Sequence, residues 1–194
     1  MRVRIGGKDA FIQLVSPGQI NAVLPADLPL GNITIEVLVT RGPGNTVTSE
    51  PVTMTLAAKA PYLLAPPAFS RGGKQHVVGV LPDGTFVGPP GLVSGANFRP
   101  ARPGNRVVIY GIGFGPVTPE IPAGTVTISA NALPPTRVRI GGQEAIVEFA
   151  GLANGYVGLY QFNVVVPSAP GGEVKFEIIV DGQPTSQALY FTIE

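Results

Sequence analysis

Residues 2–7 read RVRIGG, and the same six letters return at residues 137–142. In both copies arginine alternates with valine or isoleucine, so an extended chain carries charge on one face and apolar side chains on the other. The two glycines that follow can both adopt positive φ, as the two-residue turn of a tight β-hairpin requires. The motif therefore predicts, twice in one chain, a half-buried strand that runs into a hairpin.

The similarity between the two copies continues beyond this motif. Three further segments of the first copy match segments of the second, namely 8–12 with 143–147, 19–25 with 161–167, and 31–37 with 172–178. Each copy ends with one more apolar strand, near 52–56 and 188–193. No segment has a sustained apolar period of 3.6 residues, so we expect an all-β chain with almost no helix.

The second copy has a long lead-in that the first copy lacks. Two strands are predicted before its RVRIGG motif. The first is 106–111 (RVVIYG), a glycine-rich turn at 111–115 follows it, and the second strand is 125–128 (TVTI). In the first copy a single residue, Met1, precedes the motif. If both copies fold alike, the first lacks its opening strands and exposes core together with an unpaired strand edge. We therefore expect something else to fill that gap.

A stretch rich in proline and glycine, residues 57–104, joins the copies. Its middle, residues 76–87 (HVVGVLPDGTFV), predicts a hairpin that turns at Asp83-Gly84. The stretch is too apolar for a plain linker. We expect it to pack on one of the two copies or on a neighbouring molecule.

Composition narrows the class of protein. Apolar residues make up 44% of the 194 residues, enough for a core, while charged residues are only 13%, about half the usual share. The net charge is +1, so no basic face and no nucleic-acid partner are expected. No run of 18 apolar residues occurs, which predicts no membrane span. Residues 1–5 do not begin a signal peptide, so the numbering starts on a mature chain, a fragment or a cytosolic protein.

One stretch of the second copy resembles a known family. Residues 110–119 (YGIGFGPVTP) are similar to the opening hairpin of the IPT/TIG class of immunoglobulin-like domains. Together with residues 155–164 (GYVGLYQFNV), they resemble the Solibacter-type repeat domain at the C-termini of large exported proteins of Acidobacteria. The first copy has a shorter form of that second motif at 15–21 (VSPGQIN), and 81–85 (LPDGT) is an analogue of the family's Asn-x-Asp-Gly linker motif.

The resemblance implies two tandem immunoglobulin-like β-sandwiches, the first without its opening strands, joined by a segment that contains a hairpin. The two units would span residues 1–64 and 105–194, with residues 65–104 between them. It also implies export and an extracellular or cell-surface location, with the signal peptide outside this sequence. The family has no known catalytic residues to carry over.

Residues that could carry chemistry are few and scattered. His76 is the only histidine and there is no cysteine, so a zinc site would depend on carboxylates around one imidazole; we expect a surface residue of a strand instead. No GxSxG motif presents a nucleophile. Glu144 and Glu148 share one strand, as do Glu173 and Glu177, which predicts solvated strand faces rather than a glycosidase pair. We therefore expect no enzyme activity, no cofactor and no metal.

Some residues are candidates for binding. Tyr156 and Tyr160 lie in a loop that is longer in the second copy. Exposed loop tyrosines can bind a glycan or a protein partner, and the alternative is that they tuck under the end of the fold as core. The arginines of the two RVRIGG motifs predict edge protection or pairing with glutamate on a neighbouring strand, an anion-binding stripe being the alternative.

Two functional hypotheses follow. In the first, the chain is a non-enzymatic structural subunit or repeat segment of an extracellular bacterial assembly, a homo-oligomer or a filament built by β-strand complementation between subunits. In the second, it is an immunoglobulin-like adhesion or glycan- or protein-binding module of a larger surface protein, and upstream sequence restores the missing strands. The residues predicted on inter-subunit strands are Val3, Ile5, Val77, Val78, Val80, Leu189, Phe191 and Ile193.

Overall fold

The computed structural model describes residues 1–25 and 27–194. The chain is all-β as expected, and the only helical element in these residues is one 3₁₀ turn, η1 (Pro67–Phe69). The chain divides into two compact units. The first unit comprises Met1–Lys59, Ile121–Ser129 and Asn154–Gly158, and the second comprises Ala60–Glu120, Ala130–Ala153 and Leu159–Glu194.

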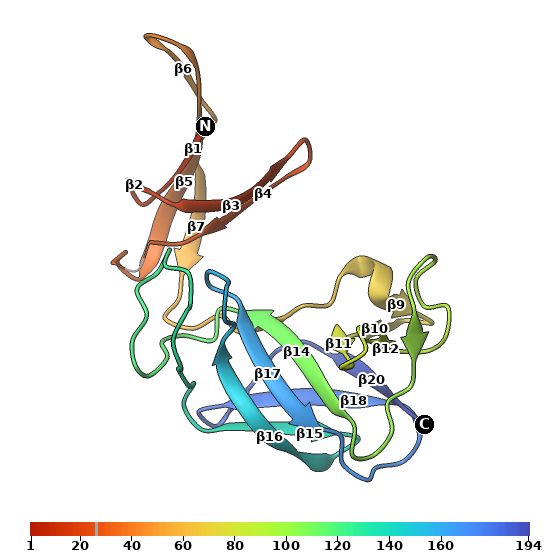
Figure 1. The fold of residues 1–194 in the computed structure, drawn as a ribbon. Coiled ribbons are helices and arrows are strands. Elements are labelled where there is room, and N and C mark those ends of the chain that lie inside the picture. The colour runs from red at the N-terminus through yellow and green to blue at the C-terminus, as the bar shows by residue number, and fades with distance from the viewer. Residues whose placement is uncertain (26) are drawn as a thin grey trace. The chain divides into compact units, whose positions relative to one another are not determined.

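The first unit consists of one antiparallel sheet and one separate hairpin (Figure 1). The strands of the sheet are β1 (Arg2–Ile5), β2 (Lys8–Asp9), β5 (Gly31–Gly42), β6 (Asn45–Thr48) and β7 (Val52–Leu56). They follow the order β2-β1-β5-β6, with β7 also paired to β5. The hairpin joins β3 (Phe11–Ser16) to β4 (Gln19–Val23).

A small core lies between this sheet and this hairpin. Its fully buried members are Val3, Ile5, Leu28 and Ile33. Partly buried residues of both layers pack against them, including Ile12, Ile20 and Ala22 of the hairpin and Ile35, Val37 and Leu56 of the sheet. The alternation of apolar and polar residues along each strand turns one face of each layer toward this core.

The second unit is built on a larger curled sheet. Its main strands are β14 (Arg106–Ile112), β15 (Thr136–Ile140), β16 (Gln143–Leu152), β17 (Tyr160–Val165), β18 (Gly172–Val180) and β20 (Leu189–Ile193). Its short strands are β8 (Tyr62–Leu63), β9 (Ser70–Arg71), β10 (Lys74–His76), β11 (Gly79–Val80), β12 (Phe86–Val87), β13 (Phe98–Arg99) and β19 (Gln183–Pro184). The order is β13-β12-β11-β14-β17-β16-β15-β18-β20-β10-β9, with β8 on β14 and β19 on β18.

The sequence repeat is also a repeat of pairing register. In the first unit Val3 lies opposite Val37, and in the second unit their sequence counterparts Val138 and Ile178 lie opposite each other. The hairpins correspond in the same way, and each carries one register shift, between Ile12 and Leu14 and between Val147 and Phe149. By this correspondence β1 matches β15, β2 with β3 matches β16, β4 matches β17, β5 matches β18 and β7 matches β20.

The glycine pairs form the predicted turns. Gly6 and Gly7 have φ of 55° and 82°, and Gly141 and Gly142 have φ of 61° and 80°. Both central residues at positive φ define the type I′ turn, whose twist matches that of the flanking strands. The two RVRIGG motifs therefore reach the same local structure.

Two predicted elements differ in the structure. The strand expected at 125–128 does not form. The backbone of Thr127 is bonded instead to the loop at 154–158: its N–H donates to the Tyr156 oxygen, and its oxygen accepts from the N–H of Gly155. The hairpin expected at 76–87 is shorter and is made by β11 and β12, with Val80 opposite Phe86. This connecting segment packs on the second unit, where β11 pairs with β14 and β10 runs parallel to β20.

The turn geometry gives a prediction with an internal control. Gly7 and Gly18 both face open space, but only Gly7 has positive φ. Gly7→Ala should destabilise the first unit by about 1–2 kcal/mol, because an L side chain is strained in the left-handed region. Gly18→Ala should be neutral or slightly stabilising, because it only reduces the entropy of the unfolded chain. Native-state hydrogen exchange of β1 and β5 amides measures both effects, and equal losses in the two variants would contradict this account.

Candidate interaction site on the first unit

Strand β4 has a partner on one side only. Within residues 1–25 and 27–194, it pairs with β3 and with no other strand. Its counterpart β17 is paired on both sides, with β16 and with β14. The second unit thus contains a strand that the first unit lacks. The outer edge of β4 presents backbone N–H and C=O groups that another strand can pair with.

Apolar side chains of β7, in the sheet that packs against this hairpin, are also exposed. Met54 pairs with Ile33, which is buried in the core, so both side chains point to the core face of the sheet. Yet Met54 is 54% exposed, and Val52, two residues earlier on the same face, is 59% exposed. Their counterparts in the second unit, Phe191 and Leu189, are 1% and 3% exposed. The same register therefore gives opposite burial in the two units.

The difference comes from β14 and the segment next to it. At Gly79 in β11, the position of a Cβ atom would lie 3.1 Å from Val107, 3.2 Å from Ile109 and 3.3 Å from Phe191. Side chains of β14 and β20 thus converge at Gly79, where an added Cβ would crowd them. In the described part of the first unit no strand occupies the corresponding place.

The opposite face of the β3–β4 hairpin is in contact with loop segments of its own unit. Gln13 Nε2 donates a hydrogen bond of 2.6 Å to the Val157 oxygen. A Cβ at Gly158 would lie 3.4 Å from Val23, and one at Gly124 would lie 3.5 Å from Phe11. Phe11 and Val23 are a cross-strand pair on the face turned away from Ile20 and Ala22. The open part of the hairpin is therefore its edge, while its core side is partly covered by the sheet.

The two candidate tyrosines take different positions. Tyr156 is 56% exposed in a loop of the first unit. Tyr160 is buried in the second unit, where its hydroxyl donates to the Gly115 oxygen and its ring lies 5.5 Å from Phe114. Burial raises the pKa of the Tyr160 hydroxyl. Tyr160 is thus a core residue, and Tyr156 alone of the pair presents a ring at the surface.

The strands predicted to exchange between subunits already have partners within the chain. Val3 and Ile5 are buried in β1, and Val80 lies in β11 between β12 and β14. Val77 and Val78 donate backbone hydrogen bonds to the oxygens of Tyr190 and Leu64. The last strand contains Leu189, Phe191 and Ile193, all buried, and it lies between β18 and β10. The structure therefore points to an open acceptor rather than to a free donor.

Sequence reasoning did not single out β4 or β7. Ile20, Ala22, Val52 and Met54 form the open surface, and none stands out alone as more than a strand residue. The available signal was the comparison of the two copies, because the lead-in strand at 106–111 of the second copy pairs with β17, the counterpart of β4. That pairing identifies which residues of the first unit are left uncovered in the described part of the chain.

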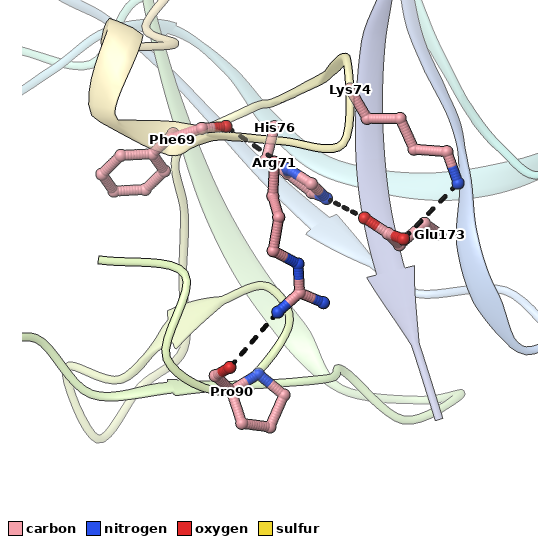
Figure 2. A network of polar contacts seen from close by, with 6 residues as sticks. All are labelled: Phe69, Arg71, Lys74, His76, Pro90 and Glu173. Carbon is pink, nitrogen blue, oxygen red and sulfur yellow. Dashed lines mark hydrogen bonds and ion pairs between the residues drawn. The ribbon is translucent and has the colours of Figure 1, made fainter. Parts of the chain in front are cut away.

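The surface position expected for His76 is wrong. His76 is fully buried, with Nδ1 3.3 Å from the Phe69 oxygen and Nε2 2.9 Å from Glu173 Oε1 (Figure 2). Lys74 Nζ lies 3.4 Å from the other oxygen of Glu173. Parallel pairing of β10 with β20 places His76 opposite Tyr190 and within reach of Glu173 on β18, instead of on an outer hairpin. Each ring nitrogen faces an acceptor, so the network ties the connecting segment to the sheet.

Glu173 is correspondingly less solvated than its strand position predicts. Partial burial opposes ionisation of its carboxyl group, but the charge and hydrogen bond of Lys74 and the hydrogen bond of His76 outweigh it, so its pKa lies below the ordinary value. The described residues contain no group of three or more His, Cys, Asp or Glu side chains that could hold a metal ion. The arrangement can stabilise the fold through charge.

Three arginines of the RVRIGG motifs, Arg2, Arg137 and Arg139, pair with carboxylates of a neighbouring strand, which is one of the expected arrangements. Arg139 Nε lies 3.0 Å from Glu144, and Arg137 lies 3.6 Å from the same carboxylate. In the first unit Arg2 lies 3.6 Å from Asp9. These pairs are exposed, so each contributes little stability. They place charge along the strands beside the type I′ turns.

Comparison of the chain with protein-family models, with curated proteins and with solved structures finds no match in any of the three. The resemblance to immunoglobulin-like domains therefore stays a prediction from the residues. In the part of the chain that the structure describes, no helix is long and apolar enough to cross a membrane.

The Glu173 network predicts a pH dependence. The folded-state pKa of Glu173 lies below its ordinary value of 4.5, so its ionised form stabilises the fold above about pH 4.5 and loses this effect as pH falls through the folded pKa. Glu173→Gln should therefore lower the free energy of unfolding most near neutral pH, and the difference from the parent should shrink below about pH 4.5.

Urea unfolding between about pH 3 and pH 7, followed by tyrosine fluorescence, measures that difference. Glu177→Gln is the matched control, because Glu177 is exposed on the same strand and β18 keeps its other contacts. A deficit in Glu173→Gln that stays constant across the pH series would show that the charge of the carboxylate is not what matters.

Proposed function

We propose that the chain is a non-enzymatic structural subunit or repeat segment of an extracellular or cell-surface bacterial assembly. In this proposal its two units are tandem immunoglobulin-like sandwiches, and a β-strand from another molecule completes the first. The observation that carries it is the unpaired outer edge of β4 together with the exposure of Val52 and Met54, whose counterparts in the second unit are buried. The second unit keeps the corresponding positions buried beneath β14.

Strand addition offers this surface what it lacks. An added strand forms main-chain hydrogen bonds along the edge and places alternate side chains over the apolar face. Fully burying a valine or methionine side chain stabilises a fold by about 1.5–3 kcal/mol, and Val52 and Met54 have more than half of that burial still to gain. An open apolar edge of this kind otherwise favours uncontrolled aggregation.

The geometry of such a contact favours a polymer. The acceptor lies on the first unit, so a donor elsewhere on a neighbouring molecule makes a head-to-tail contact that does not close on itself. Repetition of that contact gives a filament, and a contact between two acceptor edges gives a dimer. The extracellular location rests on the resemblance of residues 110–119 and 155–164 to exported repeat domains.

A second candidate is an adhesion or glycan- or protein-binding module of a larger surface protein. The observation that favours it is Tyr156, whose ring is exposed while its backbone oxygen is fixed by the N–H of Thr127. A rigid exposed tyrosine provides contact area at low cost in conformational entropy. In that case the isolated chain is a monomer and its ligand binding is lost in Tyr156→Ala.

The structural role predicts that association depends on the open face. The purified chain should associate with increasing concentration, and the double variant V52K/M54K should weaken this by about tenfold or more, because a docked strand would bury two ammonium groups. Both positions are exposed in the isolated chain, so the variant should remain folded. Light scattering and negative-stain electron microscopy measure the association, and circular dichroism checks the fold.

Val47→Lys is the matched control. Val47 is also exposed and apolar, but it pairs with Val39, about 13 Å along β5 from the residue opposite Val52. It should associate like the parent. A parent chain that stays at 20.1 kDa at every concentration would contradict the structural role, and equal losses in both lysine variants would show that the open face is not the contact.

A further inference from the structure

We infer that the strand which completes the first unit has the chemistry of β14 and is added antiparallel to β4 in the register that β14 has on β17. The occupant is a segment of a partner polypeptide in which apolar residues alternate with others over about six residues, as they do in RVVIYG. This inference rests on the proposed function, and it names the partner of the same site.

The second unit shows the register. Along the antiparallel pair β14–β17, Val107 lies opposite Val164 and Ile109 lies opposite Phe162. All four side chains are buried. The intervening residues of β14 face the other side of the sheet and are only partly buried. Every second residue of the added strand therefore decides how well it packs.

The same register can be transferred to β4 through the sequence repeat. Val164 corresponds to Ala22 and Phe162 corresponds to Ile20. An added strand would thus place one apolar residue opposite Ala22 and the next-but-one opposite Ile20. Both are core-facing residues of the hairpin. Their smaller side chains leave room for donor residues at least as large as valine and isoleucine.

The contact extends past the strand itself. In the second unit Val166 donates a hydrogen bond of 2.9 Å to the Asn105 oxygen, and its own oxygen accepts one of 2.8 Å from Gly104. Leu24 is the counterpart of Val166 in the first unit and is exposed. An added strand that extends, like β14, at least two residues before its first inward apolar residue would therefore reach the backbone of Leu24.

The outward face of β4 keeps the side-chain arrangement of β17. Gln19 Nε2 donates a hydrogen bond of 2.5 Å to Asn21 Oδ1. In β17 the counterparts Gln161 and Asn163 make the same hydrogen bond at 2.8 Å. Those two residues lie opposite Tyr110 and Val108 of β14. The strand beside the gap thus has the same polar pair as the strand that β14 occupies.

A second copy of the chain does not offer its own β14. That strand lies between β17 and β11 within its sheet, and its inward residues Val107 and Ile109 are almost completely buried. Its release would open the core of the second unit. The β14 of a second copy is therefore not the donor, and in this proposal the β14-like segment belongs to a partner polypeptide, whose binding competes with self-association.

The test uses the whole chain and a fluorescent peptide of residues 102–112 (RPGNRVVIYGI). We expect saturable binding of one peptide per chain by fluorescence anisotropy, slower hydrogen exchange of β4 amides, and conversion of self-associated chain to the complex. A peptide with Val107→Lys and Ile109→Lys should bind about tenfold more weakly or worse, because both charges would enter the core.

The matched peptide with Val108→Lys and Tyr110→Lys has the same added charge on the outward face, and it should bind within about threefold of the parent peptide. Equal binding of the two variants would overturn the register. Failure of every peptide to bind, in a chain that still associates through the face of Val52 and Met54, would overturn the donor chemistry and leave the proposed function standing. Oligomers that the peptide cannot displace would show that a second copy of the chain occupies the edge of β4. If the chain neither bound the peptide nor associated with itself, the donor chemistry and the proposed function would both be overturned.

Discussion

The pairing of β14 with β17 is the interaction on which the second unit depends. Through it, the side chains of β14 reach Phe191 across β11, and both sides of β17 obtain backbone partners. The first unit repeats the register of the remaining strands but has no described strand in that place. Where the neighbours correspond, burial agrees, as in Val3 and Val138; where β14 is the neighbour, it diverges, as in Met54 and Phe191. The comparison within one chain thus shows the combined effect of β14 and the connecting segment beside it.

That constraint also limits how stable the first unit can be alone. The buried cluster between its sheet and its hairpin has four side chains among the residues described, Val3, Ile5, Leu28 and Ile33. Small cores leave little surplus over the conformational entropy of folding. A segment that binds only the folded form adds stability in proportion to its affinity and concentration. In the proposed assembly, completion of the first unit would therefore couple its folding to binding.

Much of the local structure was accessible from the sequence, and the failures share a cause. The RVRIGG motif predicted two half-buried strands and two type I′ turns, because alternation and glycine chemistry act within a few residues. The strand expected at 125–128 and the surface position expected for His76 were wrong. Both outcomes depend on partners far along the chain, the loop at 154–158 and the parallel strand β20. Local pattern contains no information about such partners.

The shape of the open surface bears on what can occupy it. Loop segments already contact Phe11, Gln13 and Val23 on the outward side of the hairpin. What remains open is the edge of β4 and the apolar residues of β7 behind it. Neighbouring strands lie about 4.8 Å apart, so the first position beyond that edge is one strand wide. An extended polypeptide can satisfy the evenly spaced backbone groups and the apolar face together, whereas a compact ligand satisfies at most one of them.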